Sequence, residues 1–469
     1  MAGTLQPDLC IVGGGASGLA LAAAASSRGL SVVLVESGEI GGDRLAQWVP
    51  SLALLAASRS NEPKVDFAQA RAQIAAAVAR IAPNYSVARL EAWNVRLIRA
   101  RGRFTRPDTL DAAGTTIKAG HFAVATGAGA KILPVQGLDL VRPLSCAELC
   151  RLEEAPSRLI VIGGDPQGIA LAQAMRRLGA EAVILAPEKL LAPLDEELVA
   201  PVRDQLARDG VRVLENIKIH RLEPLADGLC VVFVRAPNGD APPAKVERET
   251  IEGSHLLIAG GRIPVVEGVG LGAARVRYDA AGIWVDAELR TRNRRISAIG
   301  AVAKGPRSAG AADSHAQIVL RYLLHPGFRL PLEGAPFPTV ARTIMTDPEI
   351  AVTGLSEAEA RERRRAIRVL RWPFCETDRA RVDGAARGHV KLITAASGKI
   401  LGAGIVGPAA GELINLCTLA ISKGMSATDL ASIMVPYASL ADAVRQAAAA
   451  QDGNERPGLA RGLLRLLGR

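Results

Sequence analysis

Three glycines near the N-terminus have the spacing of a turn that binds phosphate. Gly13, Gly15 and Gly18 fit the pattern G-x-G-x-x-G, after an apolar run at 9–12 and before an Ala-rich stretch that reaches about residue 28. Gly13 allows a tight turn from strand to helix, Gly15 leaves space for a pyrophosphate, and Gly18 lets the helix pack closely on the strand. The spacing predicts a strand, a phosphate-binding turn and a helix.

The residues around this turn add two further features of a dinucleotide site. The helix N-terminus, at Ala16 and Ser17, offers free N–H groups and positive dipole charge to phosphates. Glu36 ends the next β-branched run, at 32–35, where a carboxylate can accept a hydrogen bond from a ribose hydroxyl. Because strand, glycines, helix, strand and acid agree, the stretch predicts a site for FAD or NAD rather than an ordinary glycine-rich turn.

A second unit with the same pattern begins at residue 159. It carries Gly163 and Gly168, but Asp165 stands at the position of the middle glycine. We interpret the two units as an internal repeat of architecture. The Cβ of Asp165 would obstruct a pyrophosphate, and its carboxylate would repel each phosphate charge at 4 Å by about 4 kcal/mol if the effective dielectric constant is near 20. We therefore expect weakened dinucleotide binding at the second unit.

The rest of the chain predicts the elements that position these turns. Apolar runs at 121–124 and 256–258 predict buried strands, and returning strands are expected at 282–286 and 296–300. A Pro- and Gly-rich stretch at 326–338 marks a boundary. Beyond it, strands are expected at 342–354, 368–374, 389–394 and 400–406, with helices at 356–366, 410–423 and 427–433. These strands and helices predict an α+β domain at the C-terminal end of the chain.

Composition excludes several other classes of protein. The chain has 469 residues, enough for two to four domains. The net charge is +10, but the basic residues are scattered and aromatic residues make up only 3%, so we expect no nucleic-acid partner. Six dispersed cysteines do not suit a disulfide scaffold, and the histidines lack metal-ligand spacing. Without a signal peptide or an apolar stretch of transmembrane length, we expect a cytoplasmic protein with no metal site.

Two dinucleotide units, a return to the first and an αβ end domain resemble the FAD-dependent pyridine nucleotide–disulfide oxidoreductases. Dihydrolipoamide dehydrogenase and mercuric reductase are the nearest branches. The motifs that carry the resemblance are GGGASG with Glu36, Gly41-Gly42-Asp43 with Pro50-Ser51, ATGA at 125–128, AGGRIP at 259–264, GIWVD at 282–286 with LRT at 289–291, TDPE at 346–349, WPF at 372–374, DRA at 378–380, and VGP at 406–408 with GELI at 411–414. The resemblance covers nearly the whole chain.

The resemblance implies an α/β fold with two Rossmann-like dinucleotide-binding domains and a C-terminal α+β dimerisation domain. FAD would bind the first unit, NAD(P)H the second, and a homodimer would form through the third. The implied boundaries are 1–150 and 263–335 for the FAD-binding domain, 151–262 for the NAD(P)-binding-like domain, 336–450 for the dimerisation domain and 451–469 for a basic tail. Beside the residues named above, the implied cofactor contacts are Gly42, Asp43, Ala125, Thr126, Gly127, Gly261, Gly300 and Ala301.

The redox disulfide that defines this family is missing from its expected place. The family pattern G-G-x-C-L-N-x-G-C-x-P-S-K aligns with residues 41–52, where Arg44 stands at the first cysteine. The segment is one residue short, so the second cysteine is deleted or replaced by Trp48 or Val49, and Leu52 replaces the lysine. Because no thiolate can form here, dithiol exchange is excluded at this site.

Further positions depart from the family pattern. Val435 stands where the partner's general acid–base histidine is expected, and loss of such a group costs about 10²–10⁴-fold in rate. Asp442 keeps a shortened carboxylate. Ala186 and Ala170 replace acids of the nicotinamide unit, and Ala301 replaces an aspartate that bonds the flavin ribityl chain, at about 1.5–3 kcal/mol. We expect FAD to be retained and NAD(P)H binding to be weaker.

Three smaller features stay open at this point. Cys146 and Cys150 lie four apart on an expected helix; a surrogate dithiol is conceivable, but structural packing is favoured, since the resemblance places them far from the flavin. Cys375 is expected to be buried. The tail at 457–469 is basic and leucine-rich, so it suits weak contact with an anionic membrane or, preferably, a helix docked on the dimer.

Three hypotheses follow, and we assign no catalytic residue. The first is a dimeric FAD-binding flavoprotein without dithiol chemistry, which passes electrons directly to a small acceptor such as a quinone or oxygen. The second is a non-catalytic dimer that keeps the fold as a binding or regulatory module. The third is an NAD(P)H-linked reductase with a relocated dithiol at Cys146 and Cys150.

Overall fold

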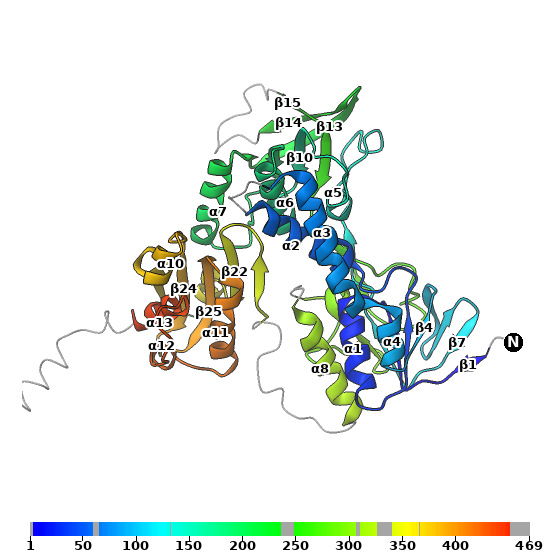
Figure 1. Ribbon diagram of the computed structural model, residues 1–469. Helices are drawn as coiled ribbons and strands as arrows, with labels where there is room; N and C mark the ends of the chain where they lie inside the picture. Colours follow the sequence, from blue (N-terminus) through cyan, green and yellow to red (C-terminus); the bar gives the residue numbers. More distant parts are fainter. Residues whose placement is uncertain are drawn as a thin grey trace, which may run out of the picture. The chain divides into compact units, whose positions relative to one another are not determined.

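The computed structural model describes residues 3–59, 65–131, 133–235, 248–305, 310–325, 340–364 and 366–450 (Figure 1). The chain divides into two compact units. The first comprises Met1–Leu191 with Leu206–Pro331, and the second comprises Ala192–Gln205 with Leu332–Arg469. The basic tail at 451–469 lies outside the described residues.

A five-stranded parallel sheet forms the centre of the first unit. Its order is β20-β8-β2-β3-β4, with β2 at Leu9–Val12, β3 at Val32–Val35, β4 at Val95–Ile98, β8 at His121–Val124 and β20 at Ile296–Ala298. Helices α1 (Ala16–Ser26) and α8 (Ala311–Leu324) pack side by side, although they are far apart in sequence (Figure 1). The returning strand therefore completes the sheet that the first βαβ unit begins.

A small mixed sheet covers part of the same core. Its order is β1-β7-β6-β5, with β1 at Thr4–Leu5, β5 at Gly102–Arg106, β6 at Thr109–Ala112 and β7 at Thr115–Ile117. Phe104 of β5 meets Phe122 of β8 edge to face, with ring centroids 5.1 Å apart. Such pairs add to the apolar area that the contact buries.

The second βαβ unit repeats the first. Its parallel sheet has the order β12-β11-β10-β16, with β10 at Arg158–Ile162, β11 at Glu181–Leu185, β12 at Arg212–Leu214 and β16 at His255–Ile258, and helix α6 spans Pro166–Arg177. An antiparallel sheet of β13 (Ile217–Leu225), β14 (Gly228–Arg235) and β15 (Glu249–Gly253) packs against it. The repeat of architecture predicted from sequence is therefore present.

Further elements of the first unit lie outside these four sheets. They are η1 (Arg44–Trp48), α2 (Val49–Ser58), α3 (Phe67–Ile81), η2 (Ala82–Tyr85), α4 (Val87–Ala92), β9 (Ala128–Ala130), α5 (Cys146–Leu149), β17 (Arg262–Pro264), β18 (Tyr278–Asp279), β19 (Gly282–Ile283) and η3 (Gly300–Val302). Helix α7 spans Glu196–Asp209. Helix α3 begins where Asp66 and Gln69 form a capping box.

The second unit is an antiparallel sheet with helices, as expected for its α+β pattern. The sheet order is β21-β22-β25-β24-β23, with β21 at Arg342–Ile344, β22 at Glu349–Gly354, β23 at Ile367–Pro373, β24 at His389–Ala395 and β25 at Ile400–Gly407. Its helices are α9 (Glu357–Arg363), η4 (Phe374–Glu376), α10 (Asp378–Val382), α11 (Ala410–Ser422), α12 (Ala427–Ala431) and α13 (Ala441–Ala449). A capping box of Ser356 and Glu359 starts α9.

Two details differ from the sequence analysis. Cys375 is exposed, because the one-turn helix η4 directs Phe374 into the core and leaves Cys375 on the outside. The run expected as a strand at 282–286 forms only the two-residue β19.

Among the described helices, none combines the length and the apolar character that crossing a membrane requires.

Candidate cofactor sites

The turn after β2 forms an open cradle at the N-terminus of α1. Gly13 has φ +115°, and a Cβ there would overlap the Ala125 carbonyl oxygen. A Cβ at Gly18 would overlap the Gly13 carbonyl oxygen, so strand and helix approach as closely as the motif requires. A Cβ at Gly15 would meet nothing within 4 Å. Since Gly15 is the N-cap and has no side chain, the first N–H groups of α1 face free space.

Backbone amides hold the carboxylate of Glu36 at the end of β3. One oxygen accepts a hydrogen bond from the Gly14 N–H and the other from the Gly38 N–H, both at 2.6 Å. Each carboxylate oxygen can accept a further bond. Glu36 is therefore oriented beside the turn and keeps acceptor capacity for a ribose hydroxyl.

Other predicted residues gather at the same edge of this sheet. Gly42 has φ +48°, and its Cβ position would lie 3.4 Å from the Cα of Gly15. Thr126 donates from Oγ1 to the Val265 carbonyl oxygen at 2.7 Å, which ties the ATGA stretch to the returning chain. Gly300 lies against Ser17. The structure thus brings together residues that are separated by nearly 300 positions in sequence.

His315 supports this edge from beneath. Its Nδ1 accepts a hydrogen bond from the Gly300 N–H at 2.9 Å, and burial lowers the pKa of the imidazole to about 4. The neutral ring therefore positions the backbone at Gly300, which precedes Ala301. Alanine at 301 offers no side-chain oxygen to a ligand, as expected from sequence.

These features fit FAD, although the structure shows no ligand. The open position at Gly15, the uncapped N-terminus of α1 and the oriented Glu36 suit a pyrophosphate and a ribose. The edge formed by 125–127 and 300–301 lies at the carboxyl ends of β8 and β20, where ligands of open α/β sheets bind.

The equivalent turn of the second βαβ unit, between β10 and α6, is closed. Gly163 repeats the geometry of Gly13: its φ is +123°, and a Cβ there would overlap the Ala259 carbonyl oxygen. The N-cap of α6, however, is Asp165, whose carboxylate accepts a hydrogen bond from the Gly168 N–H at 2.7 Å. The protein's own carboxylate therefore takes the place that a phosphate would occupy at this helix.

The surroundings of Asp165 act on its carboxyl group in two directions. Burial raises the pKa of its carboxyl group, and amides of Gly168, Gln167 and Gly261 together with the charge of Arg262 act in the opposite direction. Ala186, at the end of β11, is buried and presents no acid to a ribose. The second βαβ unit keeps the fold of a dinucleotide site but fits a pyrophosphate poorly.

The segment where the family disulfide is expected forms the turn η1 and starts α2. Arg44 donates to the Tyr85 hydroxyl oxygen at 3.0 Å, and Gln47 accepts from Arg262 at 3.0 Å. Arg262 also donates to Asp43 and to the Ala128 carbonyl oxygen. A fixed arginine network thus occupies this segment, and the sequence at 41–52 contains no thiol.

A chain of polar side chains continues from this segment into the second unit of the repeat. Gln47 donates to Gln167 of α6, and Gln167 donates to the Ser51 hydroxyl at 3.1 Å. Ser51 Oγ lies 3.9 Å from the Cys150 sulfur. Cys150 therefore packs against α2, the helix that follows the segment where the disulfide is expected.

Both of these cysteines are nevertheless buried and unreactive by their surroundings. Burial raises the pKa of the Cys146 thiol to about 12 and that of the Cys150 thiol to about 11. Since the thiolate is the reactive species, neither residue is prepared for dithiol exchange at neutral pH. Their packing agrees with the structural role favoured from sequence.

The end domain also lacks a proton-transfer pair at the expected positions. Val435 is half-buried, and Asp442 forms an ion pair with Arg445 at 2.7 Å in the first turns of α13. The Asp442 carboxylate thus already has Arg445 as its partner. Position 435 therefore offers no acid–base group.

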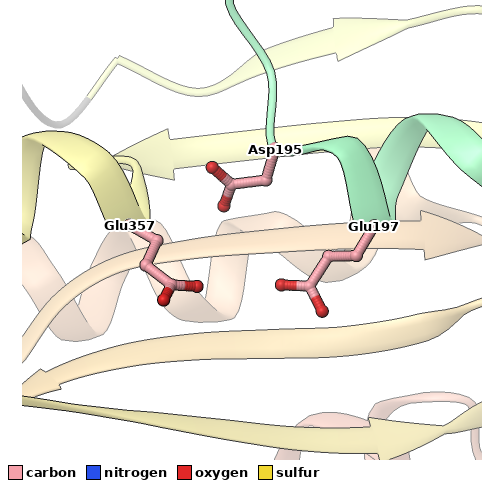
Figure 2. A group of neighbouring side chains, drawn as sticks. All are labelled: Asp195, Glu197 and Glu357. Atoms are coloured by element: carbon pink, nitrogen blue, oxygen red, sulfur yellow. The ribbon is translucent and has the colours of Figure 1, made fainter.

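Three carboxylates of the second unit converge as metal ligands could. Asp195, Glu197 and Glu357 place oxygens within 4.8 Å of one another (Figure 2). A lysine fills the space among them: Lys391 Nζ lies 2.7 Å from Asp195 and 2.7 Å from Glu357, and it also contacts Glu197. The side chain of Lys391 is 2% exposed. Arg371 also pairs with Glu197 at 2.6 Å and Arg361 with Glu357 at 2.5 Å, so the cluster is an ion-pair network of three carboxylates and three cations.

This network was not found from sequence. Burial disfavours the ammonium of Lys391, but the three carboxylates outweigh burial and raise its pKa. The one sequence signal among the described residues was a lone lysine within the apolar run HVKLITA at 389–395. A lysine in a buried strand indicates that carboxylates lie nearby, since a buried charge needs partners.

Comparisons with known proteins agree with this architecture. The model of the pyridine nucleotide-disulphide oxidoreductase family matches residues 7–316, and the model of its dimerisation domain matches residues 340–448. A mercuric reductase of Streptomyces lividans is 31% identical and covers 94% of this chain and 95% of its own. A dihydrolipoyl dehydrogenase of Thermus scotoductus is 32% identical and covers 94% and 97%.

Solved structures show the same fold. LpdA from Mycobacterium tuberculosis superposes with a TM-score of 0.81 at 26% identity and covers 95% of this chain and 99% of its own. The HOCl-induced flavoprotein disulfide reductase RclA from Escherichia coli gives 0.83 at 22% identity and covers 94% and 99%, a likeness of fold alone. The expected fold class is confirmed, and the chain belongs to the pyridine nucleotide–disulphide oxidoreductase family.

Proposed function

We propose that this chain is a dimeric flavoprotein that binds FAD at α1 and exchanges electrons directly with a small acceptor, without a thiol relay. The contrast between the two repeated helices carries the proposal. Helix α1 begins at Gly15 with free N–H groups, whereas α6 begins at Asp165 with a carboxylate already bonded to its amides. One dinucleotide site is open and the other is filled by the chain itself.

The residues of the first site would each have a defined task. The N-terminus of α1 would hold the pyrophosphate, and Glu36 would hold a ribose. His315 would keep the backbone at Gly300 in place through its bond to the Gly300 N–H. When bound, FAD supplies the two-electron redox chemistry that no side chain here provides.

The absence of thiols at 41–52 supports direct transfer to the acceptor. In place of a disulfide, Arg262 bonds Gln47 and Asp43, and the segment contains no cysteine. A quinone that accepts two electrons and two protons, or molecular oxygen reduced to hydrogen peroxide, is the kind of acceptor that needs no covalent intermediate with the protein.

Exposed apolar side chains support a homodimer through the second unit. Met434 is 99% exposed and Tyr437 is 88% exposed, on the segment that precedes α13, and Val382 and Leu419 are also exposed. Large apolar side chains so exposed on one domain suit a protein interface. Light scattering should give twice the chain mass, and Tyr437→Arg should shift the protein toward monomer.

Visible spectroscopy of the purified protein tests the proposal. We expect flavin absorbance, no bleaching by NADH or NADPH without oxygen, and rapid recovery of colour when dithionite-reduced protein meets one equivalent of menadione. A protein without flavin, after incubation with excess FAD and gel filtration, would contradict the proposal.

The same experiment separates the two other hypotheses. A non-catalytic module, which the closed site at Asp165 also favours, predicts either no flavin or a reduced flavin that a quinone does not reoxidise. A relocated dithiol predicts reduction of the flavin by dihydrolipoamide, with loss of that reaction in Cys146→Ser. The raised thiol pKa values argue against this last outcome.

A further inference from the structure

A pocket lined by arginines lies on the first unit, apart from the cofactor cradle. Its cavity volume is about 790 Å³. The polar lining residues come from three loops: Arg275 and Arg277, then Arg292, Asn293 and Arg294, beside Pro107 of the β5–β6 turn. Residues 292–294 precede strand β20, whereas Gly300 follows it, so the pocket and the cradle lie at opposite ends of this strand.

Fixed contacts hold the walls of this pocket in place. The Asn293 side chain donates to the Pro107 carbonyl oxygen at 2.8 Å and to the Ala274 carbonyl oxygen at 2.9 Å, which ties the three loops together. The Arg277 guanidinium lies 4.1 Å from the centroid of the Trp284 ring. Because these groups are already ordered, a ligand would not have to organise them.

The positive charge of the pocket is largely uncompensated. No carboxylate belongs to its lining among the described residues. Arg294 pairs with Asp286 at 2.7 Å, but Arg275 and Arg292 are exposed and form no ion pair within the described parts of the chain. Arg275 also has φ +58°, a backbone conformation that costs free energy in a residue with a side chain.

We propose that this pocket binds a small anion that carries two or more linked phosphate groups. Guanidinium groups bind phosphate oxygens through paired N–H donors, and several converging arginines need a ligand with several charges. The cavity has the volume of a small-molecule site. A single carboxylate would satisfy one arginine and leave the others unpaired.

The surroundings favour a small anion over a nucleic acid. Single-stranded nucleic acids bind through aromatic platforms on which bases stack. Trp284 contacts Arg277 and is already contacted by Lys304, whose Nζ lies 3.7 Å from the ring centroid. That ring is therefore occupied by cations, and no aromatic side chain belongs to the pocket lining among the described residues.

Calorimetric titration with inorganic tripolyphosphate tests this inference. The protein is first saturated with FAD so that the α1 cradle is filled. We expect one site per chain in addition to FAD, weaker binding at higher salt, and at least about a hundredfold loss of affinity in R275Q/R292Q, since each of the two lost bonds to a charged group is worth about tenfold or more. R292Q alone, which leaves the strained backbone at Arg275 unchanged, should lower the affinity for tripolyphosphate about tenfold.

A matched control removes the same charge elsewhere on the first unit. Arg208 and Arg212 are exposed and distant in sequence from the pocket, so R208Q/R212Q should bind tripolyphosphate as the unaltered protein does. Equal weakening by both double variants would show a general effect of net charge and would overturn the proposal. Citrate that binds as tightly as tripolyphosphate would overturn the phosphate assignment, and an oligonucleotide that binds more tightly would show a nucleic-acid surface instead.

Discussion

Replacing Asp165 by glycine should reopen the second dinucleotide site. In the structure its carboxylate accepts the Gly168 N–H at 2.7 Å and lies at the N-terminus of α6, where a pyrophosphate would otherwise bind. The substitution removes the charge, the Cβ and the internal hydrogen bond together. It also makes the N-cap of α6 the same residue type as Gly15, the N-cap of α1.

The magnitude follows from the charge that is removed. Two unit charges 4 Å apart repel by about 4 kcal/mol at an effective dielectric constant near 20. This corresponds to roughly a thousandfold in affinity. Arg262 already offsets part of the charge of Asp165, so the expected gain is smaller, between about tenfold and a hundredfold. Replacing an N-cap aspartate by glycine costs the fold only a few tenths of a kcal/mol.

Titration with ADP-ribose measures this gain, because the ligand carries the pyrophosphate without the nicotinamide. The protein is loaded with FAD and carries R275Q/R292Q in the arginine pocket, so that only the second dinucleotide site responds. Asp165→Asn serves as the control: it removes the charge but keeps a side chain at the same position, so it should recover less affinity than Asp165→Gly. An unaltered protein that binds ADP-ribose as tightly as Asp165→Gly would refute the reasoning, because the carboxylate would then not compete with phosphate.

Three further predictions concern the other sites. Gly15→Asp should impose on α1 the closure seen at α6 and abolish FAD binding, with the 450 nm absorbance as the readout; retained flavin would contradict the role of the open cradle. Lys391→Met should destabilise the protein by about 3–5 kcal/mol in urea titration, because it removes the buried cation from among three carboxylates that keep the exposed Arg371 and Arg361 as partners, whereas Lys423→Met on the surface should change stability by less than about 0.5 kcal/mol. The hydrogen bonds and charges of Lys391 and Arg371 lower the pKa of Glu197 to about 2 against the effect of burial. Its contribution to stability is therefore present above its unfolded pKa near 4.5 and is lost as pH falls from there toward 2, so Glu197→Gln should flatten this part of the acid-unfolding curve.

Local sequence spacing determined the parts of this protein that depend on neighbours in the chain. Gly13, Gly15 and Gly18 predict the first turn because strand, turn and helix follow one another directly, and backbone geometry sets where their N–H groups point. The capping box of Ser356 and Glu359 is a local signal of the same kind. The replacement of the redox cysteines by Arg44 and its neighbours also needs no structure, since a residue without sulfur cannot form a thiolate.

Tertiary structure decided the features that join distant segments. The sequence predicted that Asp165 would repel phosphate, but only the fold shows its carboxylate bonded to the amides of its own helix. Cys150 meets Ser51 across almost a hundred residues, and Lys391 meets carboxylates at 195, 197 and 357. Such partners are selected by the packing of whole elements, which residue spacing along one segment does not encode. For the same reason the sequence indicates only scattered surface charge at Arg275 and Arg292. The fold places the loops that carry them around one cavity.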